Sequence, residues 1–573
     1  MKKEHPRLEK VKHFFNRHEY LKVFCIIFVI VFLCFAPNSI KNGLSLPMNG
    51  DYVLQQLHFY VEGHDAFWSL IKTGEFKMWS YEGFLGVNYY AANTFYYLTS
   101  PFSIVLFLVP RNLMAQGIFF MYMIKLTCGG LFFYILLRKY WKLDPKVCLL
   151  GGIAYALCGW GMYYLWFNHF GDVLAVFPLT LIGVEHCLQK KQGWLIALAF
   201  LIVGMVNYYF FFAFVITSFL YAIFRYFVLF KENKGSNLKV ILMGVSYFAI
   251  GIALTGFVLI PAYNIISTMG RVEGSTLLLQ LMEYFFVNPT KVDGSYVLGS
   301  LKSVSEFFSN GNFKGLLNYL FVFDTTYVGG EAISAGQNAL YPLVGFLFPS
   351  VNNWDTMVFT NAAFDNTISN FYCSMPIILM VVPAALKTFR SKNVWKIIGL
   401  IFVIILPFVP ITYYLLNAFA MSYGRWQLFM VAAILLFTLP LIDNYQAVPK
   451  KDLDISLVVI LCLMALVTIY AFSVNKVSFE YGRGILIFVY AAYAVVCYFF
   501  LRNKCYGKNG FETIFYFVLV DLLVAGNITC FGQGTTNYWT LYGGRSHYRE
   551  QQQIINEYFE LSSDFSIAFT TPE

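Results

Sequence analysis

Long apolar runs separated by short polar segments dominate the pattern of this chain. A bilayer core of about 30 Å is crossed by about 20 helical residues, so runs close to that length are candidate spans. Their ends are marked by charged residues and by clusters of Pro and Gly. We predict thirteen transmembrane helices, at 21–37, 113–137, 147–165, 170–187, 194–206, 208–230, 240–262, 373–388, 395–412, 426–443, 454–474, 484–501 and 512–530.

Two apolar regions each fit more than one arrangement in the membrane. Several runs are short for a full span, and 194–230 fits either one bent segment or a hairpin. The stretch 101–110 (PFSIVLFLVP) is apolar but too short to cross a bilayer. We therefore expect 101–110 to be re-entrant or to lie at the membrane surface.

The distribution of Lys and Arg predicts the orientation of the spans. Most of the 40 basic residues fall in the N-terminal segment and in short loops such as RKYWKLDPK and KTFRSKNVWK, which alternate with less basic segments. Because basic residues concentrate in cytoplasmic loops, the N-terminus is expected inside. The predicted organisation is a cytoplasmic N-terminus (1–20), an N-terminal membrane module (21–263) containing an outer loop (38–112), a large extracytoplasmic loop (264–372), C-terminal membrane helices (373–530) and an extracytoplasmic tail (531–573).

Composition indicates a membrane protein and argues against a soluble domain and against a nucleic-acid-binding protein. Hydrophobic residues make up 58% of the 573 positions and charged residues 12%, against about 25% charged in soluble domains. Lipid must therefore be the main solvent, and the fold class is an all-α polytopic integral membrane protein. The net charge of +9 reflects the basic inner loops, and no basic stripe with stacking aromatics indicates nucleic acid as a partner. The eleven cysteines form no C-x-x-C pair.

The segment GDYVLQQLHFYVEGHDAFW, from Gly50 to Trp68, is unusually polar for this chain. In a helix, Asp51, Gln55 and His58 share one face, because residues four and seven apart lie above one another. The pattern predicts an amphipathic helix at the outer membrane surface with its polar face toward a cavity. An ordinary loop helix with its charges in water fits the same pattern.

The sequence also resembles a known family over nearly its whole length. The first outer loop carries an Asp followed by Gln, a Gly-rich GFLGVN and a Tyr-Tyr…Ser-Pro-Phe before the next apolar run. DVLAVFPLTLIGVEHCL, VLIPAYNIISTMGR, FYCSMPIILMV and SYGRWQLF then follow in order. These motifs resemble the bacterial YfhO membrane-protein family.

The resemblance implies a function on the outer face of the bacterial cytoplasmic membrane. It implies a GT-C-like glycosyltransferase that takes a sugar from a polyprenyl-phosphate donor and attaches it to a cell-surface polymer, such as lipoteichoic acid or a related glycan. The partners would be these two molecules and membrane lipid. Members of the family usually run further, with an outer C-terminal domain and a last span, so we expect a truncated or partial member.

Such a transfer needs a base that takes the acceptor proton as the anomeric carbon is attacked, and one carboxylate suffices. Asp51 is the candidate base, with a helix cap or a solvated loop acid as the alternatives. Gln55 shares its face as a candidate substrate-binding residue. Asp172 in WFNHFGDV would support Asp51 or orient the acceptor, unless it only caps the following helix. His169 beside it is a candidate substrate ligand, although a lone His at a span end is usually structural.

Two arginines are candidate ligands of the donor phosphate. Arg425 in MSYGRWQLF starts a span, where an uncompensated charge is costly. The alternative is that Arg425 snorkels, so that its guanidinium reaches the membrane surface beside an interfacial tryptophan. Arg271 in STMGRVEG is the second candidate. A phosphate leaving group without pyrophosphate does not require a metal, and no cofactor is expected.

Lys125 and Asp521 lie within apolar runs, where a charge is either functional or paired inside the bundle. We expect Asp51, Asp172 and Arg425 to converge at one cavity on the outer face. Two other functions remain open. A transporter or flippase of lipid-linked saccharides would show paired inverted halves, which this sequence lacks. A non-catalytic assembly factor for surface polymers would need no base.

Overall fold

The computed structural model describes most of the predicted membrane segments and part of the loops. The described residues are 18–47, 51–80, 86–232, 238–266, 290–292, 295–297, 322–323, 326–328, 331–333, 337–338, 341–349, 370–417, 424–473, 485–503 and 510–533. Most of the predicted loop 264–372 and nearly all of the predicted tail 531–573 lie outside these ranges. The boundaries predicted for those two regions stay predictions.

The chain divides into two compact units. The first comprises Met1–Tyr208, Leu242–Val258 and Phe515–Glu573, and the second comprises Tyr209–Ile241 and Leu259–Ile514. Each unit is built almost entirely of helices in its described part, because the apolar runs satisfy their own backbone hydrogen bonds in helical form.

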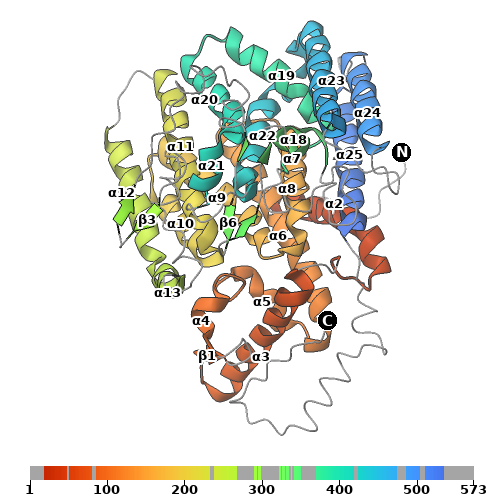
Figure 1. Ribbon diagram of the computed structural model, residues 1–573. Coiled ribbons are helices and arrows are strands. Elements are labelled where there is room, and N and C mark those ends of the chain that lie inside the picture. The colour runs from red at the N-terminus through yellow and green to blue at the C-terminus, as the bar shows by residue number, and fades with distance from the viewer. Residues whose placement is uncertain are drawn as a thin grey trace, which may run out of the picture. The chain divides into compact units, whose positions relative to one another are not determined.

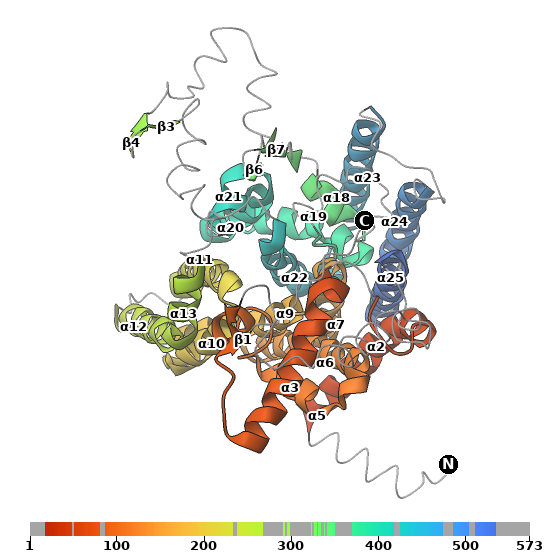
Figure 2. The ribbon, with the colours of Figure 1, turned by 60° about the horizontal axis from the view of Figure 1, so that its bottom comes forward.

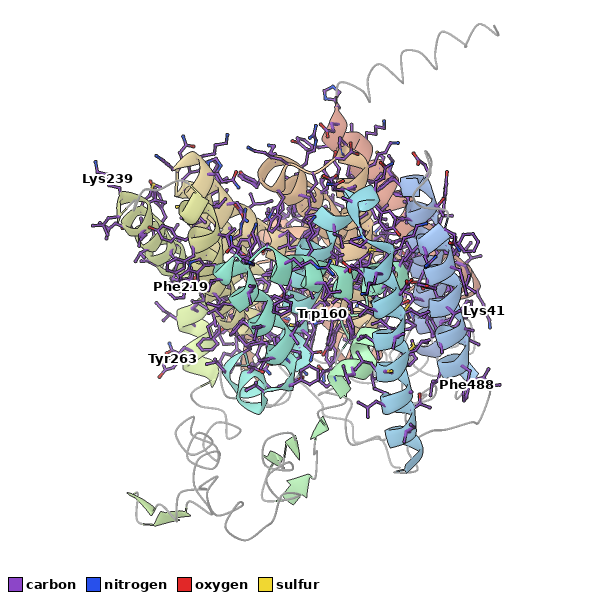
Figure 3. The ribbon with its side chains drawn as sticks, turned by 90° about the horizontal axis from the view of Figure 1, so that it is seen from above. Lys41, Trp160, Phe219, Lys239, Tyr263 and Phe488 are labelled. Atoms are coloured by element: carbon purple, nitrogen blue, oxygen red, sulfur yellow. The ribbon has the colours of Figure 1, made fainter. Side chains whose placement is uncertain are left out.

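The membrane core of the first unit forms around one long helix. Helix α6 (Met114–Leu136) packs against α2 (Glu19–Lys41), α7 (Pro145–Ala156) and α9 (Phe170–Lys190), as Figure 1 shows. Gly130 of α6 and Gly152 of α7 bring the two backbones into contact, and small residues permit such close approach between membrane helices. Trp160, from α8 (Gly159–Tyr163), is buried among the interior side chains (Figure 3).

Three further helices complete the first unit. Helix α10 (Trp194–Val206) packs along α9, and α12 (Leu238–Leu254) contacts α10 where Gly251 meets Phe200. Helix α25 (Gly510–Gln533) lies beside α2, because the Asn38 side chain donates a hydrogen bond of 3.2 Å to the Cys530 carbonyl oxygen. Asp521, the acidic residue predicted inside a span, is buried in α25.

The loop between α2 and α6 is compact and mostly helical. It contains a π-helical turn, η1 (Tyr52–Gln56), followed by α3 (Leu57–Thr73), α4 (Tyr89–Asn93) and α5 (Ile104–Leu108). Strands β1 (Trp79–Ser80) and β2 (Val87–Asn88) form a short antiparallel pair. Figure 1 shows these elements together in the lower part of the view, with α5 next to α6.

Helices also dominate the second unit. Its helices are α11 (Tyr208–Glu232), α13 (Gly256–Ile266), α18 (Tyr341–Leu347), α19 (Met375–Arg390), α20 (Val394–Ile405), α21 (Pro410–Leu415), α22 (Leu428–Ile442), α23 (Lys450–Ser473) and α24 (Ile485–Asn503). Three two-stranded antiparallel pairs accompany them: β3 (Thr290–Val292) with β4 (Ser295–Val297), β5 (Val322–Phe323) with β8 (Gln337–Asn338), and β6 (Thr326–Val328) with β7 (Glu331–Ile333).

Ion pairs and outward-facing apolar side chains characterise the second unit. Arg390 of α19 donates two hydrogen bonds, of 2.5 and 2.7 Å, to the carboxylate of Asp452 at the start of α23. Arg502 of α24 lies 2.7 Å from the carboxylate of Asp454, which follows Asp452 by two residues on α23. Phe219, Tyr263 and Phe488 are exposed on its periphery (Figure 3), as expected of helices that contact lipid.

The all-α polytopic class is confirmed, whereas the number of thirteen spans is not. Eight described helices are long and apolar enough to cross a membrane, or nine if α12 and α13, which meet at a 55° bend, form one span. The predicted runs 194–206, 395–412 and 484–501 correspond to shorter apolar helices, Trp194–Val206, Val394–Phe408 and Ile487–Asn503. The stretch 101–110 forms short turns and α5, in agreement with its being too short to span.

Candidate functional site

Asp51 lies in the loop between α2 and α6, immediately before the helical turn η1. Its backbone torsions, φ −61° and ψ −20°, are helical, and its side chain is half-buried. A capping residue usually has an extended backbone, so this geometry does not favour the capping alternative. The turn that follows, η1, is π-helical, and such turns are frequent at functional sites.

Gln55 connects this turn to a cluster of rings. It follows Asp51 by four residues, and the Tyr96 hydroxyl lies 3.5 Å from its side-chain oxygen, a long hydrogen bond. The ring of Tyr96 in turn lies 5.1 Å from that of His169. The centre of the Phe95 ring also lies 5.1 Å from that of His169. The imidazole therefore packs against aromatic rings, and it is almost completely buried.

Asp172, three residues after His169, belongs to a buried ion pair. The Lys125 ammonium nitrogen is 2.9 Å from one carboxylate oxygen of Asp172, and the two side chains are 1% and 0% exposed. Ser100 donates a hydrogen bond of 2.8 Å to the other carboxylate oxygen. Asp172 therefore joins α9, α6 and the segment before η2 (Pro101–Ser103).

The same ammonium group reaches the turn that carries His169. Lys125 donates a hydrogen bond of 3.2 Å to the Asn168 carbonyl oxygen. The Asn168 side chain accepts a hydrogen bond of 2.5 Å from the Tyr60 hydroxyl of α3. Because Tyr60 lies two turns after Asp51 on the same helical segment, the ion pair and the candidate base are connected through Asn168 and α3.

Gln56 makes the second connection between η1 and this turn. Its side-chain oxygen accepts from the Asn168 backbone amide at 3.0 Å, and its amide group donates to the Trp166 carbonyl oxygen at 3.0 Å. The two backbone groups lie in a turn between helices, where no helical partner is available to them. Gln56 thus satisfies backbone groups that burial would otherwise make costly.

Burial also fixes the protonation of Tyr60. Its hydroxyl has a pKa well above the ordinary value of 10, chiefly because burial disfavours the phenolate. The negative charge of Asp172 raises the pKa of Tyr60 further. The hydroxyl therefore stays a hydrogen-bond donor to Asn168 at any physiological pH.

The loop is fastened to the membrane helices at a second place. Thr99 donates a hydrogen bond of 2.5 Å to the Met205 carbonyl oxygen, and Asn207 donates one of 3.2 Å to the Phe95 carbonyl oxygen. Asn207 separates α10 from α11, so the break in the predicted 194–230 segment supplies a side chain that holds Phe95. The rings around His169 are consequently tied both to η1, through Tyr96 and Gln55, and to the end of α10, through Phe95 and Asn207.

Arg425 belongs to the second unit. It lies in a short 3-10 turn, η8 (Gly424–Gln427), half-buried, with its guanidinium 5.7 Å from the centre of the Tyr209 ring. The Tyr209 hydroxyl donates a hydrogen bond of 2.5 Å to the Asn417 side chain. A cation over a tyrosine face is stabilised by the ring quadrupole, which lowers the cost of placing this charge at the start of α22.

Four of the six predicted site residues lie in the first unit: Asp51, Gln55, His169 and Asp172. Arg425 lies in the second unit, so its convergence with Asp51 stays a prediction, and Arg271 lies outside the described residues. Sequence reasoning missed Ser100, Asn168, Tyr60 and Tyr96. A signal for Asn168 was its place beside His169 in WFNHFGDV, and Lys125 was recognised as anomalous but without its partner.

Among the residues that the structure describes, no three or more His, Cys, Asp or Glu side chains gather in a way that could hold a metal ion.

The fold and these buried polar contacts define a polytopic, all-α membrane protein with a structured loop packed on its first spans. Residues 23–302 match the family model described as bacterial membrane protein YfhO. The matched range is just under half of the chain; it runs from within α2 to beyond α13 and contains every residue of the buried network, and over this range the chain is similar to the YfhO family. The family is associated with glycosyltransferase-like function. No curated protein matches the chain.

Proposed function

We propose that this protein is a membrane glycosyltransferase that moves a sugar from a polyprenyl-phosphate donor to a cell-surface polymer, lipoteichoic acid or a related glycan, outside the membrane. The observation that carries the proposal is the series of contacts that runs from Gln55, four residues after the half-buried Asp51, through Tyr96 to His169. This series supplies hydrogen-bonding groups and aromatic rings on a loop that is held by membrane helices.

In the proposed reaction Asp51 is the general base. It takes the proton of an acceptor hydroxyl while that oxygen forms a bond to the anomeric carbon of the sugar. The bond between the anomeric carbon and the phosphate oxygen breaks, and polyprenyl phosphate leaves with the electron pair. Attack from the face opposite the phosphate inverts the anomeric configuration.

Gln55 and His169 are proposed to bind substrate beside this base. The Gln55 amide can donate to and accept from sugar hydroxyls, and the aromatic rings around His169 offer apolar faces to a sugar ring. Asp172 is engaged on both carboxylate oxygens by Lys125 and Ser100. We therefore assign Asp172 the supporting part of its predicted role, in which it holds the turn with His169 in place.

The phosphate that leaves needs a cationic partner, and Arg425 and Arg271 are the proposed candidates. A guanidinium binds phosphate with two parallel hydrogen bonds, which lysine cannot reproduce. These two assignments stand apart from that of Asp51, and that of Arg425 has its own test.

The deciding experiment uses the full chain in lipid nanodiscs. The protein is incubated with a panel of radiolabelled polyprenyl-phosphate sugars and membranes that bear the acceptor polymer, and transfer of label to the polymer is measured. The Asp51→Asn variant is the inactive control. We expect transfer from at least one donor by the unaltered protein and loss of that transfer in the variant.

The two other functions give different results in the same system. A transporter or flippase in proteoliposomes would move labelled lipid-linked sugar across the membrane without transferring it, and Asp51→Asn would leave that movement intact. An assembly factor would neither transfer nor move the label. Either result would overturn the proposal.

A further inference from the structure

The first outer loop exposes large apolar side chains where a loop in water would bury them. Trp68 and Ile71 of α3 are 38% and 61% exposed, and Ile104 and Leu108 of α5 are 59% and 73% exposed. We call these four residues the α3–α5 surface. Each pair is spaced by three or four residues, so each lies along one side of its helix.

The two helices form one continuous surface because they are directly joined. The rings of Phe67 and Phe107 stack with their centres 4.5 Å apart and their planes nearly parallel. The indole nitrogen of Trp68 donates a hydrogen bond of 3.0 Å to the Phe107 carbonyl oxygen. Figure 2 shows α3 and α5 side by side, as Figure 1 does from another direction.

Chain continuity sets the level of this surface relative to the membrane. Helix α5 ends at Leu108, and the span that contains α6 begins at Arg111, only three residues later. Helix α5 also packs on α6 itself. The α3–α5 surface must therefore lie beside the point where α6 enters the bilayer.

The spans also expose apolar side chains at the ends that adjoin the loop. Leu113, in the first turn of the α6 span, is 43% exposed, and Ile40 at the end of α2 is 65% exposed. Both lie at the membrane face to which the loop belongs, because α2 ends and α6 begins there. A charged rim accompanies the apolar residues: Arg111 lies 2.9 Å from the Asp65 carboxylate in an exposed ion pair.

We propose that the α3–α5 surface docks into the interfacial region of the bilayer on the face where α2 ends and α6 begins. Apolar helices that lie flat at this depth bury their apolar side chains while their polar rim stays among head groups. Trp68 fits this position, since tryptophan is enriched at membrane surfaces. The proposal does not depend on the enzymatic activity proposed above.

The test places a photo-reactive amino acid, p-benzoyl-L-phenylalanine, at Ile71 or Leu108. The full chain is reconstituted in vesicles of phosphatidylethanolamine and phosphatidylglycerol with radiolabelled acyl chains, then irradiated. We expect lipid adducts at both positions, at least several-fold above the control. Because both side chains are exposed, the replacement leaves the packed core intact, and the gel-filtration profile checks this.

Two positions give matched controls. Ser69 is exposed on α3, and its place two residues before Ile71 puts it on roughly the opposite side of the helix. It should give only background labelling. Leu33 of α2 is exposed on a span and should be labelled strongly. Labelling of Leu33 with only background at Ile71 and Leu108 would overturn the proposal, as would adducts to a second copy of the chain in place of lipid.

Discussion

Lys125 and Asp172, 47 positions apart in the sequence, form an ion pair of 2.9 Å inside the first unit. The pair lies within apolar helices, where an isolated charge is expensive. Its remaining hydrogen bonds, from Ser100 and to the Asn168 carbonyl, satisfy groups that would otherwise be desolvated without a partner. The pair therefore links α6 with α9, and through Ser100 it also links the loop to these helices.

The first prediction concerns the stability of this pair. Removing one partner leaves the other charged and buried, which typically costs about 3–5 kcal/mol. We expect Lys125→Met and Asp172→Leu each to lower the unfolding temperature of the detergent-purified protein strongly. The double variant should recover much of the loss, because replacement of both charges by apolar groups is often neutral.

The exposed pair of Arg111 and Asp65 is the control for this measurement. Exposed pairs contribute about 0–1 kcal/mol, so Arg111→Ala should shift the unfolding temperature little. If the double variant proved as unstable as the sum of the two single variants, the residues would act independently, and the ion pair would not explain the packing of the loop.

The second prediction distinguishes the base from a binding residue. Asp51→Asn preserves the size of the side chain but removes its basic lone pair. Loss of a general base costs about 10²–10⁴ in rate, so single-turnover transfer should fall by that factor while donor affinity stays near that of the unaltered protein. Near-normal turnover would remove Asp51 from the mechanism.

Asp65→Asn provides the comparison. It alters an exposed acid on the same helical segment, outside the proposed site, and should leave the rate unchanged. If both variants lost activity equally, the effect would arise from the net charge of the loop and the assignment of Asp51 would fail.

Sequence alone was sufficient for the fold class because its signal is local. The apolar run around Ile27 is continuous, and a helix is the form in which such a run satisfies its backbone in lipid. The number of spans is harder, because runs such as 194–206 are apolar enough to look like spans and yet form shorter helices. Whether an apolar run of marginal length spans the membrane cannot be decided without knowing what its helix packs against.

For the candidate site, a single sequence carries only the signal of short spacing. Asp51 and Gln55 are four residues apart, so helical periodicity places them on one face. Nothing local connects Lys125 with Asp172 or Tyr60 with Asn168, because those contacts arise when α6, α9 and α3 pack together. Tertiary contact over more than 40 residues leaves no periodic signal in a single sequence.

The third prediction concerns Arg425 by itself. If it binds the donor phosphate, Arg425→Ala should weaken donor binding and slow transfer together, because the interaction contributes to the ground state and to the leaving group. Arg425→Lys should recover only part of both, since lysine lacks the planar two-pronged geometry. Lys387→Ala, an exposed cation of α19 in the same unit, is the control. A change in rate with unaltered affinity would contradict phosphate binding.

The fourth prediction concerns the contact between α6 and α7. A Cβ atom at Gly130 would lie 2.7 Å from the Gly152 carbonyl oxygen, and a Cβ atom at Gly152 would lie 2.7 Å from the Gly130 carbonyl oxygen. These neighbours are backbone atoms that cannot rotate away, so Gly130→Ala must separate the two helices. Overpacking of a tight core costs about 1–3 kcal/mol, and we expect a clearly lower unfolding temperature.

Gly244→Ala is the matched control, because its Cβ would meet only the Cys187 sulfur at 3.5 Å, an ordinary contact. Equal stability of the two variants would show that the close approach of α6 and α7 does not constrain the fold.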